Sequence, residues 1–135
     1  MPDTSDRASP SEAFDATRVA VVTGGGHGIG RALSRRLSSI AETVVVADVE
    51  GGAAERVAAD IGGHAYYLDV ANEADLAALV AEVEEALGPI DLFVSNAGVG
   101  YGDADDGAAS RGGRLGPVDD RWEACWHINV MAHVY

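Results

Sequence analysis

Short apolar runs alternate along the chain with longer amphipathic stretches. The apolar runs are rich in β-branched residues and predict four strands, at 19–23, 43–48, 64–69 and 90–95. In the amphipathic stretches apolar residues recur every three or four positions, which predicts helices at 29–41, 53–61, 73–87 and from Asp119 or Asp120 to Tyr135. The third helix has the clearest signals, because Asn72 is placed to cap its start and Gly88-Pro89 to end it.

The alternation of strand and helix predicts an α/β fold. Strands joined by helices run parallel, and right-handed crossovers place the helices on both faces of the sheet. The second strand, 43–48, is apolar throughout, as expected for a strand covered on both faces. We therefore expect a Rossmann-type, doubly wound sheet in a three-layer α/β/α arrangement, incomplete at about four strands in the order 3-2-1-4. In such a sheet the ligand binds over the carboxyl ends of the strands, where the strand order reverses.

Two segments fall outside this alternation. Residues 1–17 contain Ser, Asp and Pro and are expected to form a disordered tail. Residues 100–117 are rich in Gly, Asp, Ala and Ser and are expected to form a flexible loop within a domain that spans 18–135. The aspartates of this loop lack the spacing of a calcium-binding loop, so no metal site is expected at Asp103, Asp105 and Asp106.

Composition narrows the classes of partner. The 135-residue chain carries a net charge of −13, which argues against nucleic acid and anionic membranes as partners. No apolar run approaches the ~18 residues of a membrane span, and the N-terminus lacks the pattern of a secretory signal. The single cysteine cannot form an internal disulfide. Together these features predict a cytoplasmic protein.

The richest motif lies between the first strand and the first helix. It reads Thr23-Gly24, three residues, then Gly28-Ile29-Gly30. A glycine turn at a helix start presents free backbone N–H groups and the positive end of the helix dipole, which together bind a phosphate or pyrophosphate. A P-loop would continue with Lys and then Ser or Thr, whereas Gly30 is followed by Arg31-Ala32. The pattern T-G-x-x-x-G-x-G also departs from the common G-x-G-x-x-G fingerprint.

Asp48 ends the second strand, 20 residues after Gly28. At this distance from the glycine turn a dinucleotide fold places the carboxylate that accepts hydrogen bonds from the adenosine ribose hydroxyls. A 2′-phosphate would be repelled by this carboxylate, and neither His27 nor Val49 supplies an Arg or Lys against it, so NAD(H) is favoured over NADP(H). The structural alternative is an aspartate that only caps the turn after its strand.

Asn96-Ala97-Gly98 follows the fourth strand, and Asn129 lies in the last helix. With the glycine turn, these motifs resemble the short-chain dehydrogenase/reductase family over about residues 18–135. The resemblance implies that adenine contacts Asp69-Val70, although Asp69 has the alternative role of beginning the next turn. It also implies that the nicotinamide ribose lies at Asn96-Ala97-Gly98, and the Asn96 side chain can tie neighbouring strand ends together. The residues implied to bind NAD are Thr23, Gly24, His27, Gly28, Ile29, Gly30, Asp48, Val49, Asp69, Val70, Asn96, Ala97 and Gly98.

Asn129 shares a helix face with Trp122, Cys125 and Trp126, and this face is expected to be buried. In the family that the chain resembles, the matching Asn holds a water of the catalytic proton relay. The alternative is a core Asn that pins the helix to a backbone carbonyl, and the two roles are compatible. Cys125 is expected to be a packing residue and not a nucleophile, because no basic residue adjoins it.

The family's other catalytic residues are missing from the sequence. They comprise a Ser and a Tyr-x-x-x-Lys motif, and this chain contains no lysine, since all 9 basic residues are arginines. Of the catalytic group, the resemblance therefore assigns only Asn129, in support of the proton relay. We expect an N-terminal, cofactor-binding part of an NAD-dependent short-chain dehydrogenase, truncated before these residues and inactive alone. For the full-length form the resemblance implies an alcohol or carbonyl substrate and a homo-oligomer.

Two other functions remain open. The first is a non-catalytic NAD(H)-binding module that regulates a full-length relative. The second is a Rossmann-like methyltransferase that binds S-adenosylmethionine, although the placements of Asn96-Ala97-Gly98 and Asn129 argue against it. If the chain is a truncated dehydrogenase, the outer edge of its fourth strand is unpaired and its last helix, with two Trp side chains, loses part of its cover, and both features are expected to promote association.

Overall fold

The computed structural model describes residues 17–99 and 118–135. The predicted disordered tail, except for Thr17, and the predicted flexible loop at 100–117 lie outside the described residues. Within the two described ranges, no helix combines the length and the apolar character that a membrane crossing requires.

Four parallel strands form one sheet in the order β3-β2-β1-β4, which confirms the predicted order. The strands are β1 (Val19–Thr23), β2 (Thr43–Asp48), β3 (His64–Tyr67) and β4 (Leu92–Val94). Val22 of β1 pairs in register with Val46 of β2 on one side and with Val94 of β4 on the other. The order reverses at β1, so the carboxyl ends of β1 and β4 border the expected ligand site.

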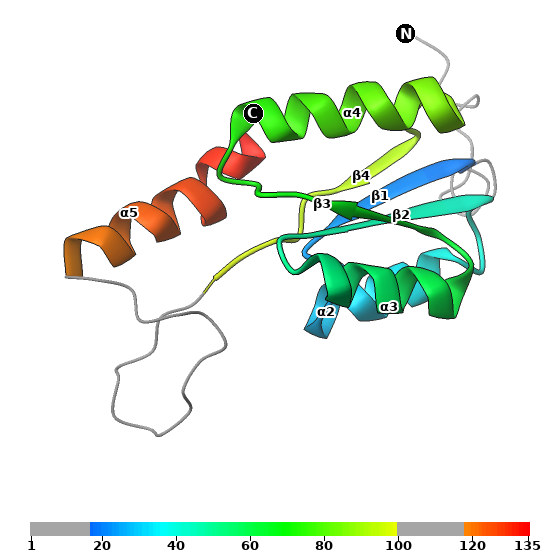
Figure 1. Ribbon diagram of the computed structural model, residues 1–135, viewed down its shortest axis with the longest axis horizontal. Helices are drawn as coiled ribbons and strands as arrows, with labels where there is room; N and C mark the ends of the chain where they lie inside the picture. Colours follow the sequence, from blue (N-terminus) through cyan, green and yellow to red (C-terminus); the bar gives the residue numbers. More distant parts are fainter. Residues whose placement is uncertain (1–16, 100–117) are drawn as a thin grey trace, which may run out of the picture.

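Helices cover both faces of this sheet, as predicted (Figure 1). The covering helices are α2 (Gly28–Leu37), α3 (Gly51–Ile61) and α4 (Glu73–Leu87); the chain ends with α5 (Val118–Asn129) and the 3₁₀ turn η2 (Met131–His133). Alternate residues of β1 face opposite layers: Val19 and Val21 join the core cluster under α4, whereas Ala20 and Val22 join the cluster under α2 and α3. Because both faces of β1 are covered, all of its residues are buried.

The start of α4 agrees with the prediction, whereas the end of α2 does not. The Asn72 side-chain oxygen accepts a hydrogen bond from the Ala74 N–H at 3.0 Å and starts α4 as expected. The predicted extension of α2 to residue 41 is wrong, since this helix ends at Leu37. The hydroxyls of Ser38 and Ser39 donate to backbone carbonyls three residues earlier, and such local bonds compete with helical continuation.

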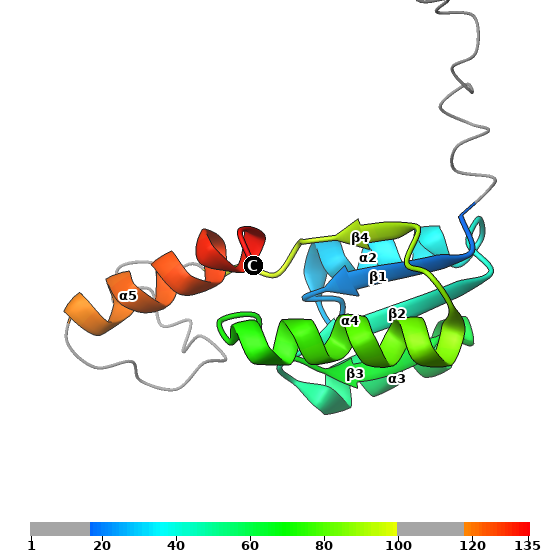
Figure 2. The same ribbon diagram turned by 90° about the horizontal axis from the view of Figure 1, so that it is seen from above.

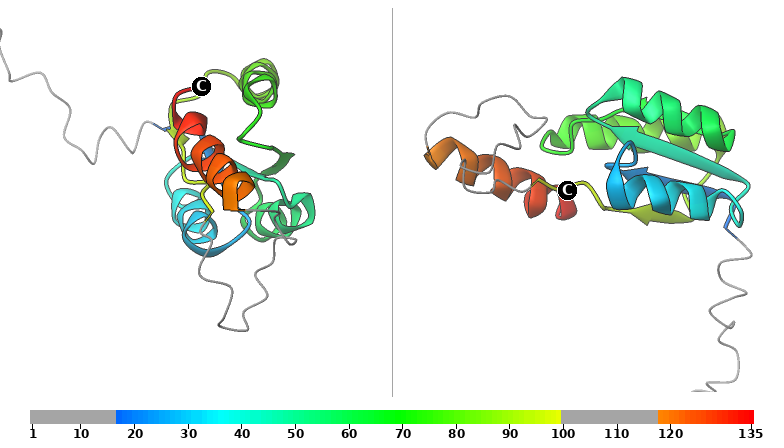
Figure 3. Two further views of the ribbon diagram at one scale, coloured as in Figure 1. Left: turned by 90° about the vertical axis from the view of Figure 1, so that its left-hand side faces the viewer. Right: turned by 90° about the horizontal axis from the view of Figure 1, so that it is seen from below.

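The last helix departs most from expectation. It ends at Asn129 instead of Tyr135, and it extends beyond the carboxyl ends of the strands instead of lying over a face of the sheet (Figures 2 and 3). The prediction of a buried face is therefore wrong: the exposed fractions of Trp122 and Trp126 are 72% and 47%, and Asn129 is also exposed. Only Ala132 of the following turn η2 enters the core, in the cluster under α4.

Candidate functional site

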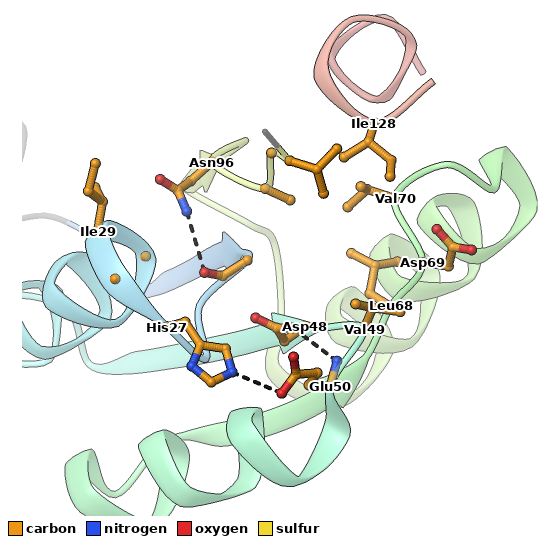
Figure 4. A pocket seen from close by; sticks show the side chains of 16 residues that line it. His27, Ile29, Asp48, Val49, Glu50, Leu68, Asp69, Val70, Asn96 and Ile128 are labelled. Atoms are coloured by element: carbon orange, nitrogen blue, oxygen red, sulfur yellow. Dashed lines mark hydrogen bonds and ion pairs between the residues drawn. The ribbon is translucent and has the colours of Figure 1, made fainter. Parts of the chain in front are cut away.

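A pocket of about 610 Å³ opens at the carboxyl ends of β1, β2 and β4 (Figure 4). Its volume lies within the range of small-molecule and cofactor sites. It is lined by all of the predicted NAD-binding residues except Thr23. The sequence therefore predicts most of the lining, and the geometry shows how these residues are held together.

Thr23 lies behind the pocket and joins the two strands whose order reverses there. Its hydroxyl oxygen accepts hydrogen bonds from the N–H groups of Asn96 and Ala97, at 3.0 and 3.1 Å. The Asn96 side-chain amide donates in turn to the backbone oxygens of Thr23 at 3.1 Å and Gly24 at 3.4 Å. Asn96 thus ties the ends of β1 and β4 together, and the two motifs form one interlocked unit.

The glycine turn is shaped by sterics as well as by backbone conformation. Gly24 has a φ of +63°, and a Cβ added there would lie 2.8 Å from the Ala97 Cα atom. Gly28 has a φ of +48°, but a Cβ there would meet no atom within 4 Å. Gly24 therefore permits the close approach of the two motifs, whereas Gly28 faces open space from which a ligand can reach the backbone.

The start of α2 carries unused hydrogen-bond donors. The N-cap residue His27 makes no capping bond with its side chain. The first N–H of the helix ladder to find an acceptor is that of Arg31, which donates to the His27 carbonyl at 3.0 Å. Within residues 17–99 and 118–135, the N–H groups of Gly28, Ile29 and Gly30 have no hydrogen-bond acceptor. Three free donors at the positive end of a helix dipole form an anion site.

Asp48 lies at the end of β2 with an exposed fraction of 8%. One carboxylate oxygen accepts the Gly26 N–H and the other accepts the Glu50 N–H, both at 2.9 Å. The carboxylate therefore holds the glycine turn against the β2–α3 connection, which is the structural role considered above. Each carboxylate oxygen retains a further lone pair, and Asp48 also lines the pocket, so the structural role does not compete with ligand binding.

A second pair of side chains bridges the same two segments. The His27 Nε2 atom lies 3.0 Å from a carboxylate oxygen of Glu50, and both side chains line the pocket (Figure 4). Glu50 was not among the predicted site residues. Its proximity to Asp48 in the sequence was the available signal, because a residue two positions after a strand end stays beside that strand end.

The remaining acidic residue of the lining is Asp69. Its side chain accepts the Ala71 N–H at 3.0 Å, and its carbonyl accepts the Asn72 N–H at 3.0 Å. Asp69 thus begins the turn that leads to α4, which was its alternative role, while Val70 packs in the core cluster under α4. Both residues also line the pocket, at the side formed by the segment after β3.

Asn129 binds the chain that leaves β4. Its side-chain oxygen accepts the Val99 N–H and its side-chain amide donates to the Val99 carbonyl, both at 2.8 Å. The residue thus pins the last helix to the backbone, as the structural alternative proposed, through an N–H group as well as a carbonyl. Ile128, the residue before it, and Val99 both line the pocket, and no pattern in the sequence indicated either one. Leu68, a core residue of the β3 end, is the other lining residue that was not predicted.

Two ionisable groups with shifted pKa values lie outside the pocket lining. Burial, together with the neighbouring Glu82, raises the pKa of the Tyr66 phenol. Hydrogen bonds from the N–H groups of Val19 and Arg18 lower the pKa of Asp91. Both shifts have structural causes at the sheet edges, so neither one marks a catalytic group.

The charged residues of the lining are mostly acidic. Asp48, Glu50 and Asp69 carry carboxylates, and His27 is the one lining residue in the described ranges whose side chain can become cationic. No group of three or more potential metal ligands occurs within the part of the chain that the structure describes. The site can therefore bind an anion through backbone N–H groups at α2, and hydroxyl groups through carboxylates at the β2 end.

Residues 18–135 match the family model of the short chain dehydrogenases. The chain is 43% identical over 84 residues to a 2,5-dichloro-2,5-cyclohexadiene-1,4-diol dehydrogenase of Sphingobium indicum, a match that covers 61% of this chain and 34% of the relative. It is 35% identical over 131 residues to a 1-deoxy-11-beta-hydroxypentalenate dehydrogenase of Streptomyces arenae, covering 87% of this chain and 41% of the relative. The chain therefore spans about a third to two fifths of the length of these curated relatives.

A solved structure shows the same fold. The crystal structure of a 3-ketoacyl-(acyl-carrier-protein) reductase from Brucella melitensis, complexed with NADH, superposes with a TM-score of 0.71 at 28% sequence identity. The match covers 87% of this chain and 46% of the reductase.

Proposed function

This chain belongs to the short chain dehydrogenase family, and because membership of this family supports the binding of a nicotinamide cofactor, we propose that the pocket binds NAD(H). The observation that carries the proposal is that the free N–H groups of Gly28, Ile29 and Gly30 and the carboxylate of Asp48 lie in the same pocket. The N–H groups suit the pyrophosphate, and the carboxylate suits the adenosine ribose. In this arrangement Asp69 and Val70 lie at the adenine, and Asn96, Ala97 and Gly98 lie at the nicotinamide ribose.

We favour NAD(H) over NADP(H) because of the charge of the lining. A 2′-phosphate would approach the carboxylate of Asp48, and Glu50 adds a second carboxylate beside it. None of the lining residues in the described ranges is Lys or Arg, the side chains that would compensate a phosphate.

For the whole protein we propose hydride transfer between the nicotinamide ring and an alcohol or carbonyl substrate. The cofactor supplies the hydride chemistry when it is bound, and the residues described here bind and orient it. The side chain of Asn129 is already occupied by Val99. We therefore propose that Asn129 supports the proton relay as a positioning residue, by holding the last helix beside the strand ends.

The 135 residues on their own lack the Tyr-x-x-x-Lys motif, because the sequence contains no lysine. We propose that this chain binds the cofactor and does not turn it over. Turnover of NAD by the purified chain with any alcohol, above a control without protein, would contradict this proposal.

Calorimetric titration of the folded chain with NADH, NADPH and S-adenosylmethionine tests the binding proposal. We expect NADH to bind, and Asp48→Asn to weaken the binding about 10-fold or more, the usual effect of losing hydrogen bonds to a charged group. Glu85→Gln, which removes an exposed acid on α4, is the matched control and should leave the affinity unchanged. Circular dichroism establishes that the Asp48 variant still folds, since this residue also holds the glycine turn.

Two results would contradict the proposal. If the folded chain binds no nicotinamide dinucleotide, the proposed function is wrong. If it binds S-adenosylmethionine and not NADH, the methyltransferase alternative replaces it.

A further inference from the structure

The contact between His27 and Glu50 closes one side of the pocket. Their facing side-chain atoms are 3.0 Å apart, and the side chains are 41% and 50% exposed. Such an exposed pair contributes little to the stability of the fold. Its position at the pocket suggests a role in ligand selection instead (Figure 4).

The backbone of this pair is fastened to Asp48 on both sides. Gly26, the residue before His27, donates its N–H to one oxygen of the Asp48 carboxylate, and Glu50 donates its own N–H to the other oxygen. The side chains of His27 and Glu50 therefore meet beside the carboxylate that is proposed to hold the adenosine ribose. A substituent on the 2′-hydroxyl of that ribose would extend toward them.

We propose that Glu50 determines the preference for a dinucleotide without a 2′-phosphate by withholding His27 from that phosphate. This inference rests on the proposed function and deepens it. His27 is the one lining residue within the described ranges that can become cationic, and the imidazole nitrogen that faces Glu50 serves as its donor. While this donor is engaged, a 2′-phosphate meets the carboxylates of Asp48 and Glu50 without a compensating partner.

Removing the charge of Glu50 changes both the engagement of the His27 donor and the number of carboxylates that a 2′-phosphate would meet. It weakens the hydrogen bond that engages the imidazole donor, because a neutral acceptor binds a donor less strongly than a carboxylate does, and it leaves Asp48 as the one carboxylate of this pair of acids. Because a 2′-hydroxyl carries no charge, the binding of NADH depends less on this change than the binding of NADPH. The ratio of the two dissociation constants is therefore the quantity that reports the proposed role.

The test measures this ratio for the unmodified chain, Glu50→Gln, His27→Gln and the double variant, by titration with NADH and NADPH. We expect Glu50→Gln to lower the ratio of the NADPH constant to the NADH constant about 5- to 10-fold, on the scale of one charge pair near a protein surface. The double variant should lose most of this gain, because the imidazole is then absent. Glu55→Gln is the matched control, since Glu55 is an exposed acid of α3, the helix that follows Glu50, and lies outside the pocket lining, so it should leave the ratio unchanged.

The results that overturn the inference are distinct. If Glu50→Gln changes the two constants equally, Glu50 acts only on the local structure. If the double variant keeps the whole gain, His27 is not the withheld group. If the unmodified chain binds no NADH, the proposed function itself fails, a result that differs from both of the others.

Discussion

The two halves of the pocket are held in place by different forces. One half is built on β1 and β2, which are buried along nearly their whole length. The other half is built on β4 and α5, where Phe93 is 37% exposed and Trp122 is 72% exposed. Both halves contribute predicted site residues, but apolar packing secures the first much more fully than the second.

Polar contacts take the place of packing in the second half. Each links β4, or the segments beside it, to β1, to the last helix or to the turn that follows it. These contacts join Thr23 to Asn96 and Ala97, Asn129 to Val99, Ser95 to His133, and Asp91 to Arg18 and Val19. The net contribution of one such hydrogen bond is about 1 kcal/mol, less than that of one well-buried aliphatic side chain. We therefore expect the β1–β2 half to be rigid before a ligand binds, and the β4–α5 half to open at lower free-energy cost.

The largest effect is expected at the junction of the two halves. In Gly24→Ala the added Cβ would require both a left-handed backbone conformation and the displacement of Ala97. The two costs together predict a loss of about 2 to 5 kcal/mol in the free energy of unfolding. Gly62→Ala is a matched control, because Gly62 has a φ of +67° and open space around it, so only the conformational cost of about 1 to 2 kcal/mol applies.

Denaturant titration of both variants measures this difference. Equal losses in the two variants would mean that the Gly24–Ala97 approach does not constrain the fold. They would also show that the two halves of the pocket are less tightly joined than the structure indicates.

A smaller difference in the free energy of unfolding is expected between substitutions in β2 and in β4, the two strands that flank β1. Val46 and Val94 both pair with Val22, and all three lie on the face covered by α2 and α3. Val46 is fully buried and Val94 is only partly buried. We expect Val46→Ala to lower the free energy of unfolding by about 2 to 3 kcal/mol and Val94→Ala by about 1 kcal/mol. A larger loss for Val94→Ala would show that β4 is as well packed as β2.

The sequence predicted the β1–β2 half better than the β4–α5 half. The unbroken apolar run of β2, the glycine turn and the Asn72 cap are local signals, and each reflects the conformation or burial of its own segment. The exposure of Trp122 and Trp126 could not be predicted from the sequence of their own segment, because it depends on which other elements pack against α5. A helical stripe of apolar residues shows which face seeks cover, but not which element supplies it.

The same distinction applies to the site. Residues that follow strand ends could be predicted, because the fold class alone brings those ends together. The partner of Asn129 could not, since the path of the chain between β4 and the last helix decides which backbone groups its amide reaches. The two roles of Asp48 could not be separated either, because a buried carboxylate at a strand end serves a turn and a ligand with the same geometry.

The exposed aromatic side chains of α5 should matter for association more than for stability. We expect replacement of Trp122 and Trp126 by Gln to change the free energy of unfolding by less than about 0.5 kcal/mol, as is usual for exposed positions. Sedimentation velocity should show less self-association of this double variant than of the unmodified chain. Tyr67→Gln is the control, because Tyr67 is an exposed aromatic residue (62%) of another element, β3, and its replacement should not reduce association. Unchanged association of the Trp variant would place the contact surface elsewhere.

A pH-dependent effect is expected at Asp91, which joins the segment before β4 to the start of β1. One carboxylate oxygen accepts the N–H groups of Arg18 and Val19, at 2.8 and 2.9 Å. These bonds lower the pKa of Asp91 from its ordinary value of 3.8. The stabilisation is therefore fully present above pH 3.8 and is lost as the pH falls through the lowered pKa of the folded chain.

Variants of Asp91 separate the charge from the hydrogen bonds. In Asp91→Asn one amide oxygen can still accept both N–H groups, whereas in Asp91→Ala no acceptor remains, so at pH 7 we expect the Ala variant to be the less stable. The difference in stability between the unmodified chain and Asp91→Asn should shrink as the pH is lowered from 5 to 3, because protonation removes the same charge that the substitution removes. Denaturant titrations at pH 7, 5, 4 and 3 measure this, with Glu85→Gln as a control for a general change in charge. If the difference persists at pH 3, the two halves are joined at this point by the shape of the side chain and not by its charge.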